Sequence, residues 1–209
     1  MIKVFFLIFE PGRAWDKIAQ ARRGFMFITI NELLPLILLG TALDAWGLYD
    51  HGKWQPRFQM FRTFSNHEIL LFEAVQFFLL FAMVFVSALM VFKISQTFHD
   101  RLTFLEAFTT VAYGFSPTLL AGFLNFFATM HPAVSWLLGS LATIWILYQG
   151  IPRVMRPDPT HAFGVYLSGM SVVILTSGLV RLITAMYLLG YMDLKHSWLA
   201  YKLAHLLGH

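Results

Sequence analysis

The chain has 209 residues, of which 58 % are hydrophobic and only 12 % are charged, and its mean hydropathy is +0.66. Soluble globular domains carry about 25 % charged residues, so this composition excludes a cytosolic enzyme, a disordered tail and a nucleic-acid-binding module. The net charge of +4 comes from scattered basic residues, and the absence of cysteine excludes disulfides and thiolate chemistry. The sequence therefore predicts an integral membrane protein with several spans and no nucleic-acid partner.

The N-terminal segment comes first along the chain. Val4–Phe9 is apolar but too short for the core of a signal peptide, and it runs into Glu10-Pro11-Gly12 rather than a cleavage site. We expect Val4–Phe9 to lie at the membrane surface and Ala14–Arg23 to form a short basic helix. Anionic lipid attracts such a helix, although its charges are equally suited to setting the topology alone.

Five apolar stretches follow, each long enough to cross about 30 Å of hydrocarbon as a helix. The predicted spans are Phe25–Tyr49, Ile69–Ile94, Leu105–Met130, Ala133–Ile151 and Phe163–Leu189. Backbone groups find no hydrogen-bond partner in lipid, so spans must be helices or strands of a closed barrel, and continuous apolar runs exclude a barrel. The predicted fold is all-α, a polytopic protein with five transmembrane helices and short amphipathic interfacial helices at both ends.

The connections and the tail complete this organisation. In the loop between the first two spans, Trp54, Phe58 and Phe61 recur at helical spacing, which predicts an interfacial helix or a docking surface. The tail pairs an apolar stripe with His205 and His209 at metal-ligand spacing, but no acid lies within a turn, so we expect no metal site. We divide the chain into an amphipathic N-terminal segment (1–24), a five-helix bundle (25–191) and an amphipathic tail (192–209).

Orientation follows from the basic residues in the connections. One side carries nine of them: Lys3, Arg13, Lys17, Arg22, Arg23, Lys93, Arg101, Arg153 and Arg156. The other side carries five: Lys53, Arg57, Arg62, Lys195 and Lys202. We therefore expect a multi-pass protein of the inner (plasma) membrane, with its N-terminus in the cytoplasm and its C-terminus outside.

Three charged residues fall at similar depth near the outer ends of their spans. Asp44, Glu73 and Arg181 each lie roughly 6–12 Å below the outer interface, at 1.5 Å per residue. Burying such charges is costly unless they pair. We expect an Arg181–Glu73 contact with Asp44 nearby, which is either an ion pair that locks three helices together, part of a solute or proton pathway, or a set of side chains that reach the headgroups.

Polar residues also gather near the inner ends of the spans. Glu32, Lys93 and Glu106 predict a second polar group, which serves either a gated path or the positioning of the bundle in the bilayer.

Pro117 lies in the middle of the third span. It removes a helical hydrogen bond and crowds the carbonyl of Tyr113, so a kink is expected between Gly114 and Pro117. The freed carbonyl of Tyr113 is expected to face Ser116, another helix or a cavity.

Three segments resemble the Yip1-domain family: LIFEPGRAWDKIAQ (Leu7–Gln20), FLEAFTTVAYGFSPTLL (Phe104–Leu120) and IWILYQGIPRVM (Ile144–Met155). The resemblance implies a five-helix bundle with a cytoplasmic N-terminus. Eukaryotic relatives act in vesicle traffic and bind Rab-type GTPases through a long N-terminal region. This chain has only residues 1–24 before its first span, which is typical of a short bacterial branch, and the GTPase role is not carried over.

No enzyme signature is present, and no cofactor is expected: the chain has no His-Glu-x-x-His helix, no Walker loop and no dinucleotide turn. The first hypothesis is a non-catalytic scaffold or adaptor that binds lipid and another membrane protein, or itself as an oligomer. The alternative is a small-solute or ion transporter with a path through the in-span charges.

Overall fold

A computed structural model describes residues 2–98, 102–127 and 130–191. Among these residues, five helical segments are long and apolar enough to cross a membrane, which confirms the predicted number of spans. They are Phe25–His51, Asn66–Thr97, Phe104–Phe126, Pro132–Val154 and Ala162–Leu188. The protein is thus a multi-pass, nearly all-α membrane protein. The tail 192–209, with its predicted surface helix and histidine pair, lies outside the described residues.

Two short helices precede the bundle: α1 (Ile2–Phe9) and α2 (Pro11–Ala21). Pro11 is tolerated in the first turn of α2 because the missing N–H would be unpaired there anyway. Trp15 of α2 is fully buried, and its indole N–H donates to the carbonyl of Ile146 at 3.0 Å. A Cβ at Gly150 would lie 2.4 Å from the Trp15 ring, so this glycine is what lets α2 dock against the fourth span.

The first span contains α3 (Phe25–Ile28), a π-helical turn η1 (Thr29–Leu33) and α4 (Leu34–His51). The N–H of Leu34 reaches back five residues to Thr29, just before Pro35. Because the ring of Pro35 would crowd the carbonyl four residues earlier, the wider turn accommodates the proline without breaking the span.

A β-hairpin replaces the predicted interfacial helix between the first two spans, so that prediction is wrong. Strands β1 (Lys53–Gln55) and β2 (Met60–Arg62) pair antiparallel, with Trp54 opposite Phe61. Pro56 lies between the strands, where it suits a turn and interrupts a helix.

Four spans follow the hairpin, and the first two of them begin with a capping box. Helix α5 (Asn66–Thr97) begins with a capping box of Ser65 and Glu68, and α6 (Phe104–Gly114) begins with one of Thr103 and Glu106. The third span continues as α7 (Ser116–Ala121) and a 3₁₀ turn η2 (Gly122–Phe126). It therefore ends four residues before the predicted Met130. The last two spans are α8 (Pro132–Val154) and α9 (Ala162–Leu188).

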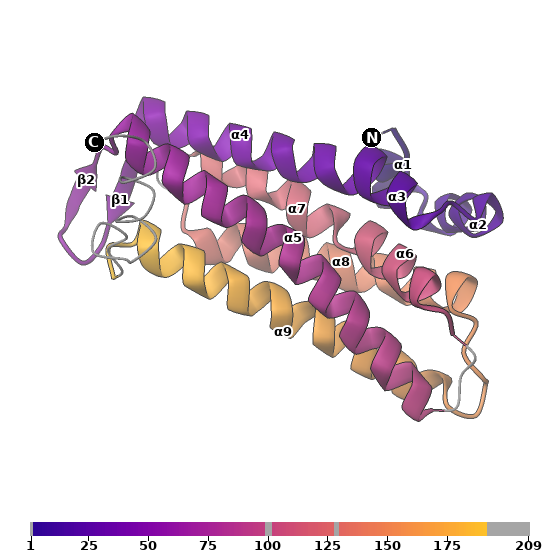
Figure 1. The fold of residues 1–209 in the computed structure, drawn as a ribbon. Coiled ribbons are helices and arrows are strands. Elements are labelled where there is room, and N and C mark those ends of the chain that lie inside the picture. The colour runs from indigo at the N-terminus through magenta and orange to yellow at the C-terminus, as the bar shows by residue number, and fades with distance from the viewer. Residues whose placement is uncertain (1, 99–101, 128–129, 192–209) are drawn as a thin grey trace, which may run out of the picture.

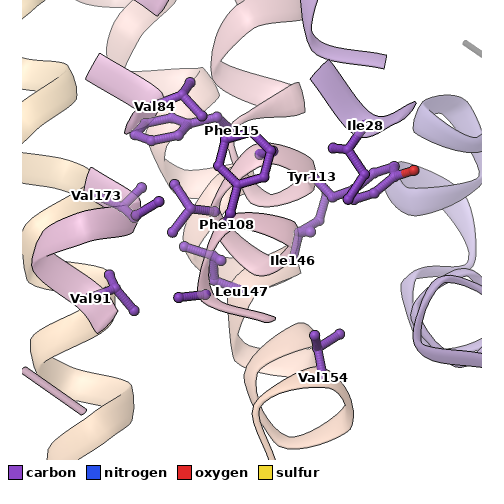
Figure 2. Close-up of a cluster of buried hydrophobic side chains, with 14 of the residues drawn as sticks. Ile28, Val84, Val91, Phe108, Tyr113, Phe115, Ile146, Leu147, Val154 and Val173 are labelled. Atoms are coloured by element: carbon purple, nitrogen blue, oxygen red, sulfur yellow. The ribbon is translucent and has the colours of Figure 1, made fainter. Parts of the chain in front are cut away.

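The core of the bundle forms around the third span. Phe108 and Phe115 are fully buried between Val84 and Val173 on one side and Tyr113 on the other (Figure 2). Helix α5 packs against α4, α6 and α9, while α8 packs against α2, α6, α7 and α9. Successive spans run in opposite directions along the bundle, so α2 and the end of α9 lie at opposite ends (Figure 1).

Candidate functional site

One polar side chain from each span converges near the hairpin end of the bundle. We call these five residues the outer polar cluster: Asp44 (α4), Gln76 (α5), Asn125 (η2), Ser135 (α8) and Arg181 (α9). All five line one cavity of about 60 Å³, which has room for only a few water molecules. A site that takes one group from every span depends on the correct packing of the whole bundle.

Arg181 donates hydrogen bonds to three residues of the same bundle. Its Nε donates to the carbonyl of Pro132 at 2.9 Å, and its Nη2 donates to the Ser135 hydroxyl at 2.7 Å and to the side-chain oxygen of Asn125. Ser135 in turn donates to the same Asn125 oxygen at 2.8 Å. The planar fork of arginine suits several fixed acceptors at once, so this residue ties α9 to α8 and η2.

Asp44 is bonded by a neutral side chain of the cluster, and a lysine of the hairpin bonds to the end of the third span. Gln76 donates to Asp44 at 2.9 Å. Above them, Lys53 of the hairpin is almost fully buried, and its ammonium donates to the carbonyls of Asn125 and Phe127 at 3.2 and 3.3 Å. Burial lowers the pKa of Lys53, while the charge of Asp44 acts to raise it. Lys53 thus satisfies carbonyls that the end of the third span leaves without a helical partner.

The predicted Arg181–Glu73 contact is wrong. Both carboxyl oxygens of Glu73 are buried and have no hydrogen-bond partner among the described residues. Gln76, three residues further along α5, faces the cavity with Asp44 and Arg181 instead. Glu73 and Gln76 lie less than one turn apart on α5, so the rotation of this helix decides which of the two side chains enters the cavity.

Glu73 lines a different feature, an open groove between α4 and α5 of about 690 Å³. Its rim carries the exposed side chains of Leu38, Tyr49, Leu70 and Phe78. We call this feature the α4–α5 groove. It combines an apolar rim with a buried carboxyl group that the chain does not satisfy.

The predicted inner polar group is divided among separate roles. Glu32 accepts from Arg23 at 3.2 Å. Glu106 accepts from the backbone N–H and the hydroxyl of Thr103, both at 2.8 Å, and so belongs to the capping box. Lys93 is exposed and lies 5.9 Å from the centroid of the Phe92 ring. These contacts fit residues that fix helix ends and depth.

The structure interrupts the third span at the position of the predicted kink. Helix α6 ends at Gly114, α7 begins at Ser116, and Pro117 occupies the first turn of α7. The Ser116 hydroxyl donates to the carbonyl of Tyr113, which is the carbonyl that Pro117 deprives of its helical donor. The break is therefore internally satisfied.

From the sequence, Gln76 and Asn125 are expected to form hydrogen bonds between helices, as they do with Asp44 and Arg181, whereas Ser135 and Lys53 are not singled out. The signal that would have linked Asn125 and Ser135 to Arg181 is their position at the ends of the short third-to-fourth connection, near the depth of Arg181. Among the described residues, no group of three or more His, Asp or Glu side chains is arranged to hold a metal.

Comparison with known families gives one match over most of the chain. The model of the Yip1 domain matches residues 5–182, which covers the docked helix α2 and all five spans up to the outer polar cluster. No curated protein and no solved structure matches the chain. The residues that first suggested the resemblance lie within the matched range. The chain belongs to the Yip1 domain family.

Proposed function

We propose that this protein is a non-catalytic adaptor that binds another membrane protein within the bilayer through the α4–α5 groove. The observation that carries the proposal is Glu73, a buried carboxyl group without a hydrogen-bond partner, two helical turns inside its span. A carboxyl group at membrane depth that no described residue binds is a candidate functional position, and we look for its partner in another membrane protein.

The surface of the groove supports a helical partner. Leu70 and Phe78 are 68 % and 69 % exposed and flank Glu73 on α5, while Ala45 and Ala74 leave space for a close approach. Small residues at an interface let helices come close together in lipid, where packing and interhelical hydrogen bonds drive association. The partner we propose is a transmembrane helix with an Arg or Lys at the depth of Glu73.

A second copy of this chain fits the groove less well. The basic side chain at this depth, Arg181, is already bound by Pro132, Asn125 and Ser135 within its own bundle. Within the described part of the chain, a copy therefore offers no free cation at the depth of Glu73, and charge complementarity favours a different membrane protein.

The proposal is tested by photocrosslinking in native membranes. A photoreactive amino acid at Leu70 or Phe78 probes the groove, and the same amino acid at Leu175, which is 72 % exposed on α9, is the matched lipid-facing control. We expect one heterologous crosslinked species from the groove positions and none from Leu175. Glu73→Leu is expected to abolish it, and the captured protein should carry a basic residue in a transmembrane helix.

Three results would contradict the proposal. These are crosslinks of equal yield from all three positions, a crosslinked homodimer at the groove, and a groove crosslink that Glu73→Leu leaves unchanged. Purification of each variant as a folded monomeric species is the control for misassembly.

A second candidate, a path for a small polar solute or a proton, is favoured by the convergence of five spans on one polar cavity. Reconstitution in liposomes tests it, because a path requires flux that Ser135→Ala or Gln76→Leu reduces in a folded protein. Absence of flux in the wild-type protein would remove this candidate.

A further inference from the structure

A second pocket lies at the opposite end of the bundle and is rich in arginine. Four arginines contribute to the lining of a cavity of about 310 Å³: Arg22, Arg23, Arg153 and Arg156. We call it the arginine pocket. The end of α2, the start of α6 and the end of α8 enclose it, so segments far apart in the sequence build it together.

The four arginines differ in their partners. Arg23 pairs with Glu32 at 3.2 Å, and Arg153 pairs with Asp16 at 3.1 Å. Arg22 and Arg156 are exposed and form no ion pair within the described part of the chain. Glu106 also lines the pocket, but its carboxylate is engaged with Thr103. Two cationic groups are therefore available to an outside anion.

The backbone holds these two arginines in place. Arg22 and Arg156 both adopt left-handed backbone conformations, with φ of 38° and 48°, and each follows directly on the end of a helix or its cap. Residues other than glycine rarely adopt this left-handed conformation. Both helices therefore end beside the pocket in a backbone conformation that is uncommon for arginine.

The floor of the pocket is apolar. Ile18 and Val154 are buried, and they contribute to the lining together with Leu105. The pocket also lies at the ends of two candidate membrane spans, where α6 starts and α8 ends. A free phosphate would use only the charges, whereas a lipid would use the charges for its phosphate and the apolar floor for its glycerol and acyl chain.

We propose that the arginine pocket binds the phosphate headgroup of an anionic phospholipid, held between Arg22 and Arg156. Arginine forks match phosphate oxygens. The single negative charge of a phosphodiester is shared by two non-bridging oxygens, one for each of the two guanidinium groups, and Arg23 and Arg153 raise the local positive potential. Basic pockets between transmembrane helices are an established kind of anionic headgroup site. This inference goes beyond the proposed adaptor function and does not depend on it.

The test measures retention of phosphatidylglycerol by the full-length protein in nanodiscs of mixed phosphatidylglycerol and phosphatidylcholine. Arg22→Gln/Arg156→Gln removes the two free charges. Arg13→Gln/Lys17→Gln is the matched control, since it removes two exposed positive charges of α2, the helix that Arg22 caps, outside the pocket. We expect the pocket variant to lose phosphatidylglycerol preference about 30-fold, at roughly five-fold per basic residue, and the control to keep most of it.

Further arms separate a lipid from a soluble phosphate and from diffuse attraction. Inorganic phosphate at millimolar concentration should not displace the retained phosphatidylglycerol. Full displacement by inorganic phosphate would overturn the assignment to a lipid, and equal losses in both variants would overturn the assignment to this pocket. If the pocket variant fails to fold, Arg22→Lys/Arg156→Lys keeps the charge without the fork, and an unchanged preference would then overturn the fork geometry proposed here.

Discussion

Replacing Arg181 by Met removes three hydrogen bonds, to Pro132, Asn125 and Ser135. Hydrogen bonds between transmembrane helices are worth about 0.6 kcal/mol on average and about 1.7 kcal/mol at most, so the lost bonds amount to roughly 2–5 kcal/mol. The same change also removes the cost of a buried charge, about 2.5–3.5 kcal/mol on insertion scales. The free energy of unfolding of the single variant therefore cannot identify the partner of Arg181.

A double-mutant cycle isolates the partner. For Arg181→Met with Asn125→Ala, we expect a coupling free energy of about 1–2 kcal/mol, because a charged donor meets a buried acceptor. For Arg181→Met with Glu73→Gln, additivity within about 0.5 kcal/mol is expected, since no hydrogen bond or ion pair joins the two residues. The assay is reversible unfolding in mixed micelles. A larger coupling with Glu73 than with Asn125 would refute the described geometry of the outer polar cluster.

Three further outcomes are expected. Trp15→Ala should destabilise the docking of α2 by about 3–5 kcal/mol, whereas Trp15→Phe, which loses the bond to Ile146 and part of the buried ring but keeps an aromatic side chain, should cost less; equal protease sensitivity at α2 in both variants would contradict this. Gly139→Ala should cost about 1–3 kcal/mol in thermal stability, because its Cβ would lie 2.8 Å from atoms of α7. Gly24→Ala, with nothing within 4 Å, is the control and should be near neutral. Because burial lowers the pKa of Lys53, the unfolded chain binds more protons between the folded-state and unfolded pKa values, so stability should rise with pH there. Lys53→Met should remove that rise in a pH series of unfolding measurements.

The spans could be predicted because lipid imposes a single demand on many residues at once. Every backbone group in the hydrocarbon needs a partner, so apolar length alone indicates a helix, whatever the individual side chains are. The break at Pro117 could be predicted for the same local reason, since a missing N–H is a property of the residue itself. Both predictions needed no knowledge of the neighbouring helices.

The pairing of the polar groups could not be predicted in this way. Depth follows from counting residues along a span, but the facing of a helix depends on its rotation, which all of its neighbours set together. Glu73 and Gln76 are three residues apart and about 60° apart around α5. Gln76 nevertheless lines the cavity, whereas Glu73 lines the groove. The hairpin does not follow from spacing alone, because Trp54, Phe58 and Phe61 also fit a helix. Pro56, which interrupts a helix and suits a turn, is the residue that favours the hairpin.

The hairpin is also what completes the outer polar cluster. The third span ends early, at Phe126, so its last carbonyls stand near the outer end of the bundle without helical donors. A strand at Lys53–Gln55 buries the first and third of its side chains, which directs Lys53 onto the carbonyls of Asn125 and Phe127 and lets Gln55 donate to the carbonyl of Leu188. Helical spacing would not place both side chains on one face.

Most polar groups at this end are therefore used by the fold itself, across all five spans and the hairpin. Glu73 lies at the same end but lines the α4–α5 groove, where no described residue binds it, and Arg22 and Arg156 of the arginine pocket form no ion pair with described residues. A charge that the bundle does not satisfy is costly to keep in or near lipid, and a structural role does not explain it. These positions, rather than the well-bonded Arg181, are where a partner helix and a lipid headgroup should be sought.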